Sequence, residues 1–268
     1  MNDVPTTYVI HAIKYAHHSR KGSENLIHSG DLHDSDMPLD FFVWALVSEN
    51  RTFVVDIGFS AKTGKKRGRE LIRCPTAGLK MVGIDAAAVK DVIITHMHYD
   101  HVGNFDLFPN ATFHLQDREV AYSTGRQMTK PVFSAAYNVE DVVDVVRGVY
   151  EGRVKFHNGD ANLASGVSLH HIGGHTDGLQ IVRVWTERGW VVLAADASHL
   201  YANMDQVNPF PIVFNVGDMI AGYDQLRELA DTTDHIIPGH DPLVMDKYPA
   251  SSPELNGIAV RLDLPPIS

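Results

Sequence analysis

Three imidazoles and one carboxylate lie within the six-residue stretch 96–101, which reads His-Met-His-Tyr-Asp-His. These side chains are the ligands that divalent transition metals take in proteins. The apolar run 92–94 precedes them and predicts a short buried strand that delivers them to its exposed end. In an extended chain His96 and His98 project from the same side, so the two can bind one ion together.

Asp100 and His101 follow at the point where the chain leaves this predicted strand. We expect them in a short helical stretch through Phe105, where they would face a neighbouring point instead. The spacing therefore predicts two metal ions. The alternative is a solvated His-rich loop, or core histidines bonded to the backbone, because the chain contains 16 histidines.

Later apolar segments repeat this arrangement of a predicted strand followed by a possible metal ligand. Three segments do so: 167–172 before His175, 191–195 before Asp196 and 235–237 before His240. Strands that end at one rim would bring these side chains together on rigid elements, as a dinuclear catalytic site requires.

The remaining patterns predict an α/β chain without internal repeats. The other expected elements are strands at Thr6–Ala16, Phe41–Val47, Thr52–Ile57, Ala111–Leu115, Leu179–Trp185 and Trp190–Ala195, and helices at Val139–Val149 and Ile220–Ala230. Residues 235–237 are the last strand that we expect.

Several polar features each have two interpretations. Asp56 ends a strand before Gly58, and it either caps a turn or orients a metal ligand by hydrogen bonding. The basic run Lys62–Glu70 is expected on a solvated helix face rather than at an anion site. The loop 17–38 is expected to be solvated rather than to form a second metal site, although its length also allows a place at the pocket mouth or in a subunit contact.

Composition limits the partners and the compartment. The 268 residues are expected to form one domain spanning 1–268, and their net charge of −10 argues against nucleic acid and membrane surfaces as partners. Cys74 is the only cysteine, so no intrachain disulfide can form, and we expect it as a small packed side chain. The N-terminal residues resemble neither a signal peptide nor a spanning helix, so a cytoplasmic location is expected.

Taken in this order, the motifs resemble those of the metallo-β-lactamase superfamily. Its pattern is H-x-H-x-D-H, a later His in a G-H-T stretch, a bridging Asp after a strand and a final His, and the resemblance runs from Asp56 to His240. It implies an αββα sandwich, in which two mixed β-sheets are flanked by helices and the site lies at the sheet edges.

The resemblance also implies a ligand set for two divalent ions that share one carboxylate. If the ligand roles of the family apply to the matching residues here, one ion would be bound by His96, His98 and His175 and the other by Asp100, His101 and His240. Asp196 would bind both ions. Zinc is the expected ion, with manganese, iron and cobalt as alternatives, because His/Asp sites accept all four.

Within the superfamily, the residues narrow the expected activity. Asp196 stands where class B β-lactamases typically place a Cys, and His98 stands where flavodiiron proteins have a Glu. Nucleases of the tRNA-processing type would need a basic surface. Glyoxalase II shares all seven ligands but usually carries a C-terminal helical region for glutathione, whereas the residues after His240 are rich in proline.

The closest resemblance is to the quorum-quenching N-acyl homoserine lactonases. It lies in Asn110-Ala111-Thr112 with Gln116, in Pro38-x-x-Phe41-Phe42 and in Gly239-His240-Asp241-Pro242. Such lactonases commonly carry a Tyr shortly after the bridging Asp, which contacts the substrate carbonyl. Here His199 follows Asp196, with Tyr201 two residues on, so either is a candidate for that contact.

The expected function is a metal-dependent hydrolase that opens a lactone by attack of a metal-bridging hydroxide. Asp100 would transfer a proton to the leaving oxygen, and His199 or Tyr201 would stabilise the oxyanion. The stretch 199–218, with Phe210 and Phe214, is expected to be irregular and to form a wall for an uncharged, partly apolar lactone, or else to pack on the core.

Three alternative activities remain open from the sequence. These are a thioester hydrolase of the glyoxalase II type, another cyclic-amide or ester hydrolase, and a mononuclear iron dioxygenase acting on persulfides. A lactone is the expected partner. A homodimer is possible, but no motif specifies it.

Overall fold

The computed structural model describes residues 4–28 and 33–267, whose strands form two mixed sheets. In the larger sheet the strand order is β13-β1-β2-β3-β5-β6-β7, with β4 also paired to β1. These strands are β1 (Val9–His18), β2 (Leu39–Val47), β3 (Thr52–Val55), β4 (Glu70–Leu71), β5 (Asp91–Ile93), β6 (Thr112–Gln116), β7 (Val154–His157) and β13 (Ala259–Arg261). Strands β3, β5, β6 and β7 pair in parallel, whereas β13, β1, β2 and β3 pair antiparallel.

The smaller sheet has the strand order β12-β11-β10-β9-β8. Its members are β8 (Ala161–Ala164), β9 (Val167–His171), β10 (Gln180–Thr186), β11 (Gly189–Ala195) and β12 (Ile236–Pro238). Only β11 and β12 pair in parallel. The β10–β11 hairpin turns at Gly189, whose φ of +109° suits glycine.

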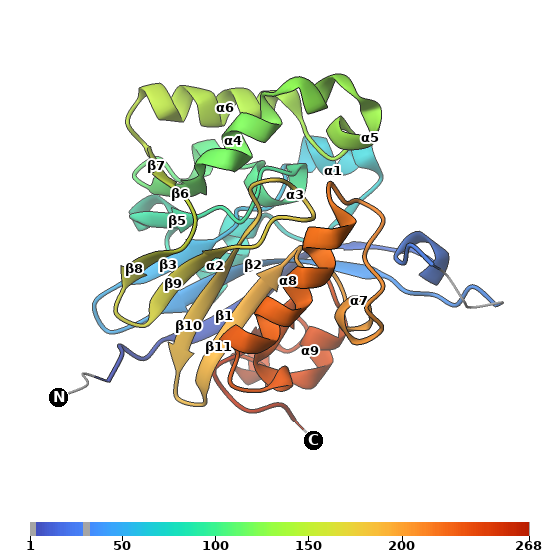
Figure 1. The fold of residues 1–268 in the computed structure, drawn as a ribbon. Helices are drawn as coiled ribbons and strands as arrows, with labels where there is room; N and C mark the ends of the chain where they lie inside the picture. The colour runs from blue at the N-terminus through green and yellow to red at the C-terminus, as the bar shows by residue number, and fades with distance from the viewer. Residues whose placement is uncertain (1–3, 29–32, 268) are drawn as a thin grey trace.

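Helices cover both sides of the strands. They are α1 (Ala61–Arg67), α2 (Pro75–Met81), α3 (Tyr99–Val102), α4 (Asp117–Ser123), α5 (Pro131–Ser134), α6 (Val139–Tyr150), α7 (Tyr201–Asp205), α8 (Val216–Leu229) and α9 (Leu243–Lys247). Figure 1 shows α4, α5 and α6 on one side of the strands and α7, α8 and α9 on the other. The prediction of two mixed sheets flanked by helices is confirmed.

The apolar strands are buried because they lie between these layers. Every residue of β2 except Val47 is buried, and so are three of the four residues of β3. Strands buried on both faces are expected to be apolar throughout, without alternation. The packed strands give the loops at their ends a rigid support.

Four expectations about the elements were wrong. β1 begins at Val9 and continues to His18, and a further strand, β13, pairs with β1 although the proline-rich end suggested none. Cys74 is exposed just before α2, so it is not a packed side chain. The stretch after Asp196 contains the short helix α7 and is therefore only partly irregular.

Among the described residues, no helix is both long and apolar enough to span a membrane.

Candidate active site

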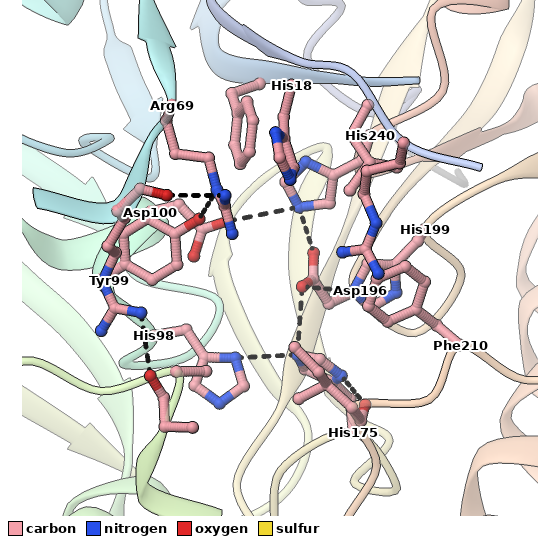
Figure 2. Close-up of a pocket in the computed structure, with 17 residues that line it drawn as sticks. His18, Arg69, His98, Tyr99, Asp100, His175, Asp196, His199, Phe210 and His240 are labelled. Carbon is pink, nitrogen blue, oxygen red and sulfur yellow. Dashed lines mark hydrogen bonds and ion pairs between the residues drawn. The ribbon is translucent and has the colours of Figure 1, made fainter. Parts of the chain in front are cut away.

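The candidate ligands lie where strands of both sheets end. β5 of the larger sheet precedes His96, while β9, β11 and β12 of the smaller sheet precede His175, Asp196 and His240. Figure 2 shows Asp196 between His240 on one side and His175 on the other, with His98 beside His175. The structure thus brings the separate motifs together at one edge of the sandwich.

The first cluster consists of His96, His98, His175 and Asp196, all of them buried. The Nδ1 atom of His98 lies 3.0 Å from Nε2 of His96 and 2.9 Å from Nε2 of His175. The Oδ2 atom of Asp196 lies 3.1 Å from Nε2 of His175 and 3.6 Å from Nε2 of His96. Three imidazole nitrogens and one carboxylate oxygen therefore converge, which is a donor set that suits zinc.

The second cluster combines Asp100, His101 and His240 with the other oxygen of Asp196. The Oδ1 atom of Asp196 lies 3.0 Å from Nε2 of His240 and 3.4 Å from Nε2 of His101. The Oδ2 atom of Asp100 lies 3.8 Å from each of these two nitrogens. Since the two oxygens of Asp196 face different clusters, this carboxylate is placed to bind two ions at once.

Two buried atoms in these clusters have no hydrogen-bond partner among the described residues, namely Nε2 of His101 and Oδ1 of Asp196. Buried polar atoms normally have a partner. A cation between these atoms would satisfy both. The ligand atoms of the first cluster lie within 4.8 Å of one another, and so do those of Asp100, His101 and His240. The side chains therefore fit a pair of divalent ions.

The protonation states of His96, His98 and Asp196 favour metal binding. Burial lowers the pKa of His96 and of His98 well below the usual value, so both imidazoles are neutral and keep a lone pair for a metal. Burial alone would raise the pKa of Asp196, but the neighbouring His199 and His240 hold that pKa well below its usual range. The shared carboxylate is therefore ionised.

Asp56 orients His101 through the ring nitrogen that faces away from the cluster. Its Oδ2 atom accepts a hydrogen bond of 2.7 Å from Nδ1 of His101, and it is fully buried. The backbone N–H and the hydroxyl of Thr95 each donate a further bond of 2.8 Å to this carboxylate. Its φ of +57° is costly for a residue other than glycine, a strain typical of functional sites. Of the two interpretations from the sequence, these contacts support the orientation of a ligand.

Backbone carbonyls hold two further histidines in the same way. Nδ1 of His175 donates to the carbonyl of Ile212 at 2.7 Å, and Nδ1 of His240 donates to the carbonyl of Asp40 at 3.0 Å. Both bonds leave Nε2 as the atom that faces the cluster. Such outer contacts fix the tautomer and the ring orientation of metal-binding histidines.

Glu119 on α4 is a buried residue that the sequence did not single out. Its carboxylate accepts hydrogen bonds from the N–H of Met97 at 2.8 Å, the hydroxyl of Thr176 at 2.6 Å and the hydroxyl of Tyr137 at 2.9 Å. Met97 and Thr176 lie in the two loops that carry the first cluster. Glu119 therefore ties these two loops together. The sequence does not reveal this role, because acidic residues are common in the first turn of a helix.

The two candidates for contacting the substrate carbonyl lie in different places. His199 lines the pocket, with Nε2 at 3.0 Å from Oδ2 of Asp196 and with the Phe210 ring stacked on it at 3.7 Å. Tyr201 is not among the residues that line the pocket, and the ammonium of Lys247 lies 4.4 Å from the centre of its ring. The geometry therefore favours His199.

The expected aromatic wall is only partly present. Phe210 lines the pocket, whereas Phe214 packs against Tyr122 and Phe133, with ring centres 4.9 and 5.9 Å apart. Phe214 thus belongs to the packing behind the wall, which was the alternative interpretation of this stretch.

A pocket of about 220 Å³ opens over the two clusters. Arg20, Arg67 and Arg69 line it together with His18, so one wall of the pocket carries three guanidinium groups, which the sequence did not predict. The lysines of the basic run are exposed as expected, but Arg67 and Arg69 are not part of a solvated face. The described part of the loop 17–38 does reach the pocket mouth, through His18 and Arg20.

The metallo-beta-lactamase superfamily model matches residues 40–250 of this sequence. That span contains all the residues of both clusters. Among curated proteins, the chain is similar to the N-acyl homoserine lactonase AttM of Azorhizobium caulinodans, with 29% identity over 186 residues. It is also similar to an N-acyl homoserine lactonase of a Bacillus species, with 31% identity over 133 residues.

These two alignments cover 65% and 49% of this chain, and 65% and 48% of the relatives. The chain therefore matches less than two thirds of the length of either relative. Among solved structures, a quorum-quenching N-acyl homoserine lactone lactonase superposes with a TM-score of 0.73 and 22% identity, over 90% of this chain and 95% of that one. The dizinc quorum-quenching lactonase AidC superposes with a TM-score of 0.66 and 17% identity, over 90% and 92%. At these identities the two superpositions establish the common fold.

Proposed function

This chain belongs to the metallo-β-lactamase superfamily, and from that premise we propose that it is a metal-dependent hydrolase that opens a lactone ring. One observation carries the proposal: the two oxygens of Asp196 face two separate clusters of histidine and aspartate ligands. The curated relatives named as N-acyl homoserine lactonases support a cyclic ester as the substrate.

The two clusters would hold the ions through His96, His98 and His175 on one side and Asp100, His101 and His240 on the other, with Asp196 between them. Divalent ions bound there would supply Lewis acidity, which polarises a carbonyl oxygen and makes water nucleophilic near neutral pH. We take zinc as the ion because a solved structure with the same fold is a dizinc lactonase. A cytoplasmic location and a homodimer remain predictions.

The chain's own residues would orient the lactone and move the proton. Asp100 lines the pocket, so its carboxylate is placed to transfer a proton to the alcohol oxygen that leaves when the ring opens. His199 also lines the pocket, and its contact with Asp196 fixes its orientation. We assign His199 the hydrogen bond to the carbonyl oxygen, an interaction that is typically worth about 3 kcal/mol in the transition state.

The test is proton release by metal-replete protein from a panel of substrates. The panel contains acyl homoserine lactones of several chain lengths, one thioester and one β-lactam. We expect turnover of lactones, and we expect His98→Ala to abolish it, because this histidine contributes a ligand atom to the first cluster.

His170→Ala is the matched control, since His170 on β9 bonds to Ser168 and to Asp160 and belongs to neither cluster. It should leave the rate unchanged. Turnover of the thioester alone would move the protein to the glyoxalase II type of activity. Oxygen uptake with a persulfide and a single iron would contradict the hydrolase.

A further inference from the structure

Three arginines lie over the candidate metal centre, on segments that are distant in the sequence. Arg20 follows β1, Arg67 ends α1 and Arg69 precedes β4, and all three line the pocket. His18 lines it beside them, and Figure 2 shows Arg69 and His18 at the edge of the pocket opposite His98 and His175. The chain carries a net charge of −10, so this concentration of cationic groups is local.

The pocket arginines differ from six of the ten other arginines of the chain, while Arg73, Arg126, Arg183 and Arg188 also form no ion pair with a described carboxylate. Six others form ion pairs with a carboxylate: Arg51 with Asp91, Arg118 with Asp177, Arg147 with Asp144, Arg153 with Glu151, Arg227 with Asp224 and Arg261 with Asp263. Within residues 4–28 and 33–267, none of the three pocket arginines has such a partner. No direct ion pair with these parts of the chain therefore neutralises their charges.

The hydrogen bonds divide the three arginines into two kinds. Arg67 donates from both terminal nitrogens to the wall of the pocket, including the carbonyls of Ala135 and Tyr137. Arg69 donates from Nε to the hydroxyl of Tyr99 at 3.0 Å and from Nη1 to the carbonyl of Arg67. Its Nη2 makes no bond to the described residues. Arg67 therefore uses both terminal nitrogens within the protein and keeps only its buried Nε, while Arg69 keeps a terminal nitrogen for a ligand.

Arg20 also keeps donors. It bonds to the described residues only through Nη2, to the carbonyl of Glu24, and its buried Nε has no partner among them. Its guanidinium lies 4.9 Å from the centre of the Phe210 ring, which in turn stacks on His199. The rings of Phe210 and His199 thus lie between Arg20 and the shared carboxylate of Asp196.

Two carboxylates line the pocket among residues 4–28 and 33–267. They are Asp100 and Asp196, and both belong to the candidate metal clusters. Burial and then the charges of Arg69 and Arg20 lower the pKa of His18 to about 4, so this imidazole is neutral and the arginines carry the positive charge of the wall. A ligand that carries a negative charge would complement it.

We propose that Arg20 and Arg69 form a subsite for a carboxylate on the substrate, so that the lactone hydrolysed here is an anion. The inference rests on the proposed lactone hydrolysis and adds the substrate class. The scissile carbonyl would lie over the metal clusters, with the carboxylate a few bonds away beside Phe210. A pocket of about 220 Å³ is small for an enzyme pocket and suits a short acyl chain.

The test compares two lactones that differ only in charge. N-succinyl homoserine lactone carries a carboxylate, and N-succinamoyl homoserine lactone carries an amide of the same shape. We expect metal-replete wild-type protein to prefer the anion by about tenfold or more in kcat/KM, as charge-assisted hydrogen bonds are among the stronger ones. Arg20→Gln and Arg69→Gln should each lower kcat/KM for the anion by about tenfold to a hundredfold, mainly through KM, and leave the amide within about threefold.

Two further variants separate this subsite from a structural effect. Arg20→Lys and Arg69→Lys keep the charge and should restore part of the preference, while Arg147→Gln removes an exposed arginine on α6 and should change neither substrate. Equal losses for both lactones, or a wild-type protein that does not distinguish them, would overturn the subsite. A carboxylate bound only by the metals would give a preference that the arginine variants retain, which also overturns it.

If neither lactone is hydrolysed, the proposed reaction fails but the subsite can still be decided. Calorimetric titration of the same two compounds into metal-replete protein then gives the answer. Tighter binding of the anion that Arg20→Gln and Arg69→Gln abolish would support the subsite, and equal binding of the two compounds would refute it.

Discussion

The metal-ligand clusters and the arginine wall border one pocket but are built in opposite ways. In the clusters, side chains such as His101, His175 and His240 are each held by a second hydrogen bond on the far ring nitrogen. In the wall, Arg20 and Arg69 keep donors that no described residue uses. The first region is completed by the protein apart from the ions, whereas the second needs a ligand.

The difference indicates where the chemistry and the specificity reside. A preorganised inner region lowers the cost of catalysis, because its dipoles and ligands do not have to reorganise during the reaction. An outer region with unsatisfied donors selects among substrates, since a ligand without the matching group leaves those donors unpaired. Substitutions in the two regions should therefore affect rate and selectivity differently.

The largest effect is expected from Asp196→Ala, at the centre of the inner region. The change removes the carboxylate whose two oxygens face both clusters, so metal content should fall and lactone turnover should drop by more than about a hundredfold. Elemental analysis and proton release measure the two quantities. Asp205→Ala, on the exposed end of α7, is the control and should change neither. Full activity with Asp196→Ala would mean that the inner region is not the catalytic centre.

A smaller loss is expected from Asp56→Asn, which breaks the support of His101 without touching the substrate. The side-chain amide of the variant can turn its NH2 group towards Nδ1 of His101, which is itself a donor, so the hydrogen bond that orients His101 is weakened. Metal affinity or activity should therefore fall by about tenfold to a hundredfold. Competition with a chelator measures the affinity. Asp91→Asn changes a similar Asp–His pair, that with His114, outside both clusters and should leave metal affinity unchanged. Equal affinities of the two variants would show that Asp56 does not position the site.

Glu119→Gln should affect stability more than selectivity. The amide cannot accept from all of the donors that the carboxylate satisfies, so the free energy of unfolding should fall by about 1 to 3 kcal/mol. Urea denaturation of the metal-replete protein measures this. Turnover of anionic and neutral lactones should fall together, because Glu119 ties the ligand loops and not the wall. A loss confined to the anionic lactone would contradict this role.

The smallest effect is expected from Tyr201→Phe, which tests the boundary of the pocket. Since Tyr201 does not line the pocket, kcat/KM for every lactone should stay within about threefold of wild type. His199→Ala should reduce turnover much more, by about a hundredfold, if it bonds the carbonyl oxygen as proposed. The opposite ranking would move that contact from His199 to Tyr201.

The same division separates what the sequence predicts from what it does not. The inner residues follow apolar strands, either in one contiguous motif or just after a strand end, so their types and spacing predicted a site that the structure brings together. The wall comes from separate segments whose local patterns suggest solvated loops and helix faces. Arg69 lies in the pocket because α1 ends at Gly68 in a left-handed conformation, with a φ of +64°. A basic run does not reveal such a turn.

Two further features were hidden for related reasons. Glu119 matches the ordinary preference of helix starts for acids, and only its burial among donors from distant loops sets it apart. β13 has three residues and pairs with β1, which lies at the other end of the chain. Both depend on non-local contacts, which a local pattern cannot specify.

The central claim, a dinuclear metal centre that hydrolyses lactones, is tested most directly by metal titration. Zinc is returned stepwise to protein stripped with a chelator, while proton release from an acyl homoserine lactone is recorded together with the bound metal. Full activity that is reached only at two ions per chain is the result expected from the two clusters around Asp196. Full activity at one ion per chain, or lactone turnover that survives complete removal of metal, would contradict the account.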